Sequence, residues 1–62
     1  MKRLDTIRVY RDSLGECRWT RRAPAGRTIA ESNTGQPASD AATTDAERRN
    51  PDTNFRMEIA RT

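Results

Sequence analysis

The chain has 62 residues, of which 32% are hydrophobic and three are aromatic, so it can form one domain with a thin core. The single Cys17 excludes an internal disulfide, and a chain without His offers few ligands for a structural zinc ion. Oligomerisation is then the usual remaining way to stabilise so small a domain. No apolar run approaches the roughly 20 residues that a membrane span needs. We therefore expect a soluble cytoplasmic protein that has no cofactor and no contact with a membrane.

The net charge of +3 hides an asymmetry between the two halves of the chain. Residues 1–30 carry eight basic and three acidic residues, a net charge of +5. Residues 31–62 carry four basic and six acidic residues, a net charge of −2. A basic half can attract nucleic acid, or it can face the acidic half of a second copy across a dimer interface. The charge distribution alone does not choose between these two partners.

Three alternating runs in the first half predict a three-stranded antiparallel meander over residues 7–11, 16–22 and 28–32. Turn-forming residues connect the runs, as Asp12-Ser13-Leu14-Gly15 and as Ala23-Pro24-Ala25-Gly26. In the second run Cys17, Trp19 and Arg21 share a face, and we place Cys17 and Trp19 in the core. Residues 1–5 are expected to be a frayed leader, and residues 33–37 are expected to form a loop.

The second half of the chain predicts one helix and a last strand. Pro37 suits the first turn of a helix, and the helical positions that follow form a narrow stripe, mostly of alanine: Ala38, Ala41, Ala42, Asp45, Ala46 and Arg49. Asn50-Pro51 ends this helix. Phe55, Met57 and Ile59 then alternate with Arg56, Glu58 and Ala60, which is typical of a strand. The predicted fold is one α+β domain over residues 1–62, in the order β-β-β-α-β, with the helix packed on one face of the sheet.

A family resemblance is carried by residues of the strands and turns, namely Tyr10-Arg11-Asp12, Gly15, Arg18-Trp19, Gly26, Ile29-Ala30 and Ser32. Their order and spacing resemble the signature of the small YegP-like domains, bacterial and archaeal proteins of uncharacterised function. Asn50-Pro51-Asp52 looks like that family's connection to the last strand, so the resemblance covers about residues 7–59. The chain departs from the pattern at Cys17, Ala25 and Gln36, where an aromatic residue, Asn and Tyr are usual. The resemblance implies a β-β-β-α-β unit that pairs as a tandem repeat or a dimer, and hence a homodimer for a single unit.

Two groups of residues are candidates for binding another macromolecule. The first group is basic and consists of Arg11, Arg18, Arg21, Arg22 and Arg27. With Tyr10 and Trp19 facing outward, these arginines would form a nucleic-acid surface, because aromatic rings stack on bases and Arg neutralises phosphates. We favour the alternative in which Trp19 anchors the core and the arginines form a solvated face. The second group is the edge of the last strand, where Phe55, Met57 and Ile59 are candidates for pairing with a partner chain.

The chain shows no constellation of residues that is typical of an enzyme. Cys17 has no His to activate its thiol, so we interpret it as a small buried hydrophobic residue. The spacing of the acidic residues does not match a calcium-binding loop and favours a solvated helix face; these residues are Asp40, Asp45, Glu47 and Asp52. A Ser/His/Asp set and a Gly-rich phosphate loop are both missing from the sequence.

The sequence therefore predicts a small non-enzymatic protein-interaction module that acts as a homodimer and binds a further protein partner of unknown identity. Two alternatives stay open. One is a nucleic-acid-binding protein that relies on its arginines. The other is an accessory protein, of the kind that phages encode, that blocks a host factor.

Overall fold

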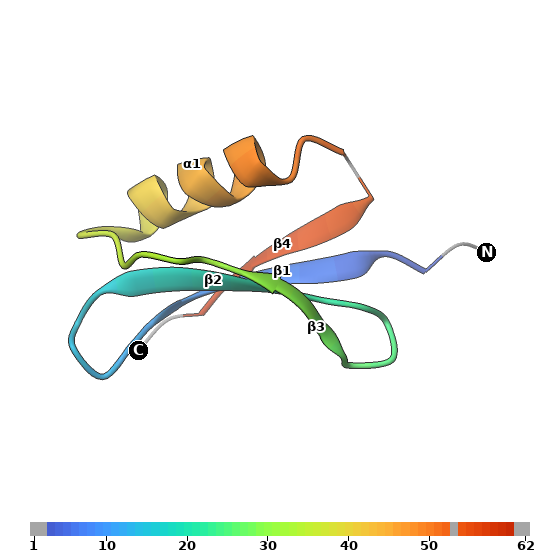
Figure 1. The fold of residues 1–62 in the computed structure, drawn as a ribbon, viewed down its shortest axis with the longest axis horizontal. Helices are drawn as coiled ribbons and strands as arrows, with labels where there is room; N and C mark the ends of the chain where they lie inside the picture. The colour runs from blue at the N-terminus through green and yellow to red at the C-terminus, as the bar shows by residue number, and fades with distance from the viewer. Residues whose placement is uncertain (1–2, 53, 61–62) are drawn as a thin grey trace.

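A mixed four-stranded sheet with one helix on one of its faces forms the fold (Figure 1). The computed structural model describes residues 3–52 and 54–60. The elements are β1 (Asp5–Arg11), β2 (Cys17–Arg22), β3 (Thr28–Glu31), α1 (Ser39–Arg49) and β4 (Phe55–Ile59), and the strand order is β3-β2-β1-β4. The predicted α+β class and the β-β-β-α-β order, with the helix packed on the sheet, are confirmed.

The two turns of the antiparallel meander form where turn residues predict them. Gly15 and Gly26 have φ angles of +82° and +97°, which residues with a side chain rarely adopt. Asp12 Oδ1 accepts hydrogen bonds from the backbone N–H groups of Leu14 and Glu16, both at 2.9 Å. This carboxylate closes the β1–β2 turn, as Asp at the start of a tight turn commonly does.

β4 lies beside β1 and runs parallel to it, whereas the other neighbouring strands are antiparallel. The pairing with β4 extends back to Asp5, which is opposite Phe55 and whose N–H donates to the Asn54 carbonyl at 3.2 Å. The expectation that residues 1–5 form a frayed leader is therefore wrong at Asp5, because the last strand and an ion pair hold this residue in β1. Residues 1–2 lie outside the described residues.

α1 begins at Ser39, two residues after Pro37, so Pro37 lies in the loop predicted over residues 33–37 and not in the first turn of the helix. Ala38 has φ −145° and ψ 158°, an extended conformation, so it is the residue that precedes the helix. The helix ends at Arg49 as expected, and the Asn50 side chain then donates to the Ala46 carbonyl at 2.8 Å. Within the described residues, no helix is long and apolar enough to cross a membrane.

The core lies between α1 and the central strands β1 and β2, and its buried residues are Ile7, Val9, Cys17, Trp19, Ala42 and Ala46. The predictions that Cys17 and Trp19 point into the core are confirmed, since they are 3% and 2% exposed. Ala42 and Ala46 have no exposed surface, and such small side chains let a helix lie close to a sheet. Because α1 packs on β1 and β2, the helix side of β4 is only partly covered.

Candidate functional site

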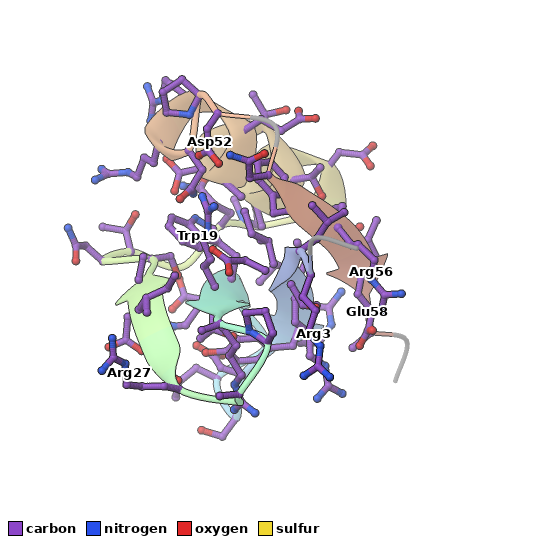
Figure 2. The ribbon with its side chains drawn as sticks, turned by 90° about the vertical axis from the view of Figure 1, so that its right-hand side faces the viewer. Arg3, Trp19, Arg27, Asp52, Arg56 and Glu58 are labelled. Carbon is purple, nitrogen blue, oxygen red and sulfur yellow. The ribbon has the colours of Figure 1, made fainter. Side chains whose placement is uncertain are left out.

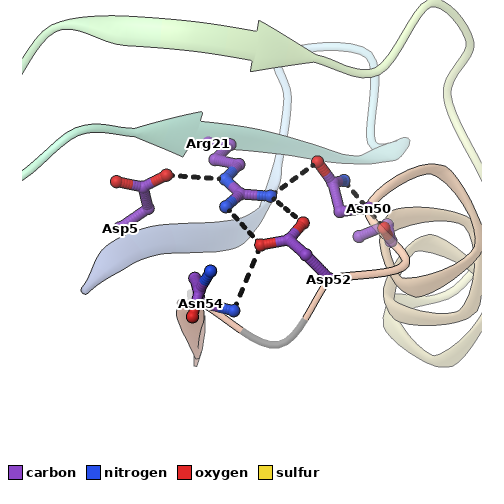
Figure 3. Close-up of polar contacts among 6 residues, drawn as sticks. Asp5, Arg21, Asn50, Asp52 and Asn54 are labelled. Atoms are coloured by element: carbon purple, nitrogen blue, oxygen red, sulfur yellow. Dashed lines mark hydrogen bonds and ion pairs between the residues drawn. The ribbon is translucent and has the colours of Figure 1, made fainter.

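Arg21 is buried, unlike the other four arginines of the predicted basic group. Its Nε donates to Asp5 Oδ2 at 2.9 Å, and its two terminal nitrogens donate to the Asp52 carboxylate at 2.8 and 2.9 Å (Figure 3). One of these nitrogens also donates to Asn50 Oδ1 at 3.1 Å, and the guanidinium carbon lies 5.2 Å from the centre of the Phe55 ring. Arg21 thus joins the start of β1 to the α1–β4 connection and leaves little exposed surface for a ligand.

The electrostatics of this cluster follow from the same hydrogen bonds. The guanidinium of Arg21 lowers the pKa of Asp52 to about 2, and the Asp52 carboxylate in turn raises the pKa of Arg21. The carboxylate stays ionised throughout the physiological range, so at neutral pH the ion pair joins the α1–β4 connection to β2. Its position among three elements indicates a structural role.

Two other arginines of the predicted group support the β1–β2 turn. Arg18 Nε donates to Asp12 Oδ2 at 2.6 Å, and this hydrogen bond lowers the pKa of Asp12 and raises that of Arg18. Arg11 donates to the Gly15 carbonyl at 2.7 Å. Arg11 and Arg18 remain accessible, but each already holds an acceptor of the protein.

Arg22 and Arg27 are exposed, and no carboxylate of the described residues lies within 4 Å of either. Arg22 is opposite Thr6 in the sheet, and Arg56 is opposite Thr6 on its other side. Since side chains of cross-strand partners share a face, Arg22 and Arg56 point to the face that α1 does not cover. Figure 2 shows Trp19 between the helix and the sheet, with Arg27 and Arg56 away from this core.

Asp45 is the acidic residue whose position differs most from the prediction. We expected a solvated helix face, but Asp45 is 6% exposed and its Oδ2 accepts from Trp19 Nε1 at 2.9 Å. Its Oδ1 accepts from Arg48 at 2.8 Å and from Arg49 at 3.3 Å. These hydrogen bonds, that of Trp19 first, lower the pKa of Asp45. The carboxylate completes the core by satisfying the indole N–H of Trp19.

The other acidic residues and Cys17 do not form a cluster that could act as a catalytic or metal site in the described part of the chain. Asp40 and Glu47 are exposed on α1, whereas Asp52 lies beyond the helix and binds Arg21. In the part of the chain that the structure describes, no three Asp, Glu, Cys or His side chains gather where they could hold a metal ion. The thiol of Cys17 is buried in the core.

The outer edge of β4 presents unpaired backbone groups. The Asn54 carbonyl accepts from Asp5 N–H, and Ala60 N–H donates to the Val9 carbonyl at 2.7 Å, so even-numbered residues direct their backbone groups toward β1. Backbone groups alternate along a strand. The N–H and C=O groups of Phe55, Met57 and Ile59 therefore point outward, to an edge where no strand of the described residues lies.

Apolar side chains accompany this open edge. Phe55 and Met57 are half-buried and pack against the core, and Ile59 is 50% exposed. A groove of about 520 Å³ adjoins Ile59 at the end of the sheet, where Ser39 begins α1. Its lining is formed by Val9, Tyr10, Arg11, Cys17, Ser39, Ile59 and Ala60. The β4 edge thus combines free hydrogen-bonding groups with incompletely covered apolar surface.

The opposite edge of the sheet is less suited to pairing. β3 has four residues, and the register between β2 and β3 shifts between Arg21 and Arg22. Short edge strands and bulges are features that discourage further strand pairing. β4 has five residues and pairs with β1 in an unbroken register. It is therefore the better candidate interface.

Comparison with family models, curated proteins and solved structures finds no match for this chain. The resemblance to the YegP-like domains accordingly stays a prediction.

Proposed function

We propose that this chain is a small non-enzymatic protein-interaction module that works as a homodimer and binds through the outer edge of β4. The observation that carries the proposal is the row of outward-facing backbone groups at Phe55, Met57 and Ile59. An exposed edge strand is a template for a strand of another chain, which then extends the sheet.

The thin core supports the same proposal. Among the described residues, six make up the buried hydrophobic cluster, and α1 leaves the helix side of β4 incompletely covered. A partner strand at this edge would satisfy polar groups and remove apolar surface from water, particularly at Ile59. Both effects stabilise a domain that has little core of its own.

Size-exclusion chromatography with light scattering, over a concentration series, tests this proposal. We expect twice the chain mass at high concentration and dissociation on dilution. Ile59→Pro removes an outward N–H that β1 does not use, so it should weaken the dimer while the fold persists. Ile59→Thr is the matched control, because it keeps the N–H and favours a strand. A wild-type monomer up to about 1 mM, or a dimer that is insensitive to Ile59→Pro, would overturn the proposal.

A second candidate function is nucleic-acid binding, which is favoured by exposed arginines on the face of the sheet that α1 does not cover. Arg22 and Arg56 flank Thr6 there, and Arg27 is exposed in the adjacent turn. This candidate has less support, because Arg11, Arg18 and Arg21 already bind acceptors of the protein. Affinity for a single-stranded oligonucleotide should fall steeply with salt if the arginines bind phosphates. Affinity that does not change with salt, or is the same for Arg22→Glu, would exclude it.

A further inference from the structure

We infer that the partner at the β4 edge is a second copy of this chain, paired antiparallel about Met57, with Arg56 of each copy opposite Glu58 of the other. This inference rests on the proposed function and adds the direction and register of the pairing. Its basis is the order of side chains along β4, which complements itself when the strand is reversed.

The backbone restricts the possible registers of such a pair. Within β4, the residues that direct their N–H and C=O groups outward are Phe55, Met57 and Ile59, so these residues must lie opposite one another in the two copies. A two-fold axis at residue 56, 57 or 58 meets this condition and keeps most of the strand paired. The register about Met57 aligns the whole of Phe55–Ile59 and forms about six hydrogen bonds between the copies.

Charge selects one of these three registers. An axis at Arg56 places two arginines directly opposite, and an axis at Glu58 does the same with two glutamates, which is unfavourable in both cases. An axis at Met57 places Arg56 opposite the partner's Glu58, and symmetry repeats this ion pair. These are the non-hydrogen-bonded positions of the antiparallel ladder, where side chains of opposite residues come closest.

The same register also buries the apolar side of β4. Phe55 would lie opposite the partner's Ile59, and Met57 opposite the partner's Met57, on the helix side of both sheets. The partner's Phe55 would then lie next to the groove that adjoins Ile59. On the uncovered face, Glu58 already lies 3.9 Å from Arg8 of its own sheet, so it would stand between two arginines.

Charge reversal at the two positions tests the register. Arg56→Glu and Glu58→Arg each create two like-charged pairs, so each single variant should dimerise about tenfold to a hundredfold more weakly than the wild type. The double variant Arg56→Glu/Glu58→Arg should dimerise more tightly than either single variant, because it exchanges the charges and restores both pairs between the copies, although it loses the contact with Arg8. Arg27→Glu and Glu47→Arg are matched controls, since they make the same charge changes at exposed sites away from β4.

Mixing the two single variants gives the decisive measurement. The register predicts that Arg56→Glu and Glu58→Arg form a heterodimer in preference to either homodimer, which native mass spectrometry would detect as an excess over the statistical mixture. A statistical mixture, or single variants that dimerise like the wild type, overturns the register. If Ile59→Pro still weakens that dimer, edge pairing stands and only the register is wrong; if Ile59→Pro has no effect either, the proposed function fails as well.

Discussion

Removal of the hydrogen bond between Trp19 and Asp45 should lower the free energy of unfolding, and the size of this effect can be worked out from the structure. Trp19 Nε1 donates to Asp45 Oδ2 at 2.9 Å, and the two residues are 2% and 6% exposed. In Asp45→Ala the indole N–H loses its acceptor inside the core, and an unpaired buried donor costs about 1–3 kcal/mol. The other partners of Asp45 are Arg48 and Arg49, whose side chains are 73% and 48% exposed. Their ion pairs add about 0–1 kcal/mol.

We therefore expect Asp45→Ala to lower the free energy of unfolding by about 1–4 kcal/mol. A domain of this size has roughly 3–9 kcal/mol in total, so the variant should lose much of its stability. Its melting temperature should fall by about 10–30 °C. Asp45→Asn keeps an oxygen for the indole N–H and should cost about 1 kcal/mol.

Urea unfolding followed by the fluorescence of the single Trp19 measures these differences, with circular dichroism as a second probe. Glu47→Ala is the control, because it removes an exposed acid from the same helix and should change stability by no more than about 0.5 kcal/mol. An Asp45→Ala variant as stable as Glu47→Ala would refute the argument that this carboxylate is the required acceptor of Trp19.

Four further outcomes are expected. The pKa of Asp52 is about 2 in the folded chain and has an ordinary value of 3.8, so the unfolded chain takes up this proton first as pH falls. The stabilisation is therefore complete above about pH 4 and is lost toward pH 2. Across this window the melting temperature should fall less steeply with falling pH for Asp52→Asn than for the wild type; equal slopes would contradict the lowered pKa of Asp52. Arg21→Met should cost about 3 kcal/mol in urea unfolding, with little recovery in Arg21→Lys because an ammonium cannot reproduce the forked hydrogen bonds; a neutral effect of Arg21→Met would argue against its structural role. Gly26→Ala should cost about 1–2 kcal/mol because φ is +97°, and a variant as stable as the wild type would show that the turn adopts another conformation. The Cys17 thiol should react with a thiol reagent only as fast as the domain opens, and immediate reaction in native buffer would contradict its burial.

Local sequence patterns were sufficient to predict the secondary-structure elements and which strand residues face the core. Alternation along the strands and turn residues around Gly15 and Gly26 predict the meander, because both signals act over a few neighbouring residues. The same alternation places Arg21 on the same side of the sheet as Trp19. This position was the signal in the sequence that Arg21 is not a surface residue. The edge residues Phe55, Met57 and Ile59 were likewise named by their spacing.

The partners of each element could not be read from the sequence, because they depend on contacts between residues far apart in the chain. The position of β4 beside β1 makes Asp5 part of a strand and brings it to Arg21. The burial of Asp45 follows from the placement of α1 over Trp19, 26 residues away along the chain. Neither contact has a local signature.

The sequence by itself thus determined which segments form strands, turns and helix, and that Cys17 and Trp19 enter the core. Only the tertiary structure points to Arg56 and Glu58 as the charged pair of the proposed dimer. In the structure, even-numbered residues of β4 form backbone hydrogen bonds with β1, so the backbone groups of odd-numbered residues point outward. This direction determines which registers a partner strand can adopt, and therefore what lies opposite Arg56 and Glu58. Strand order sets this direction, and strand order arises from long-range packing of the sheet against α1, not from the preferences of neighbouring residues.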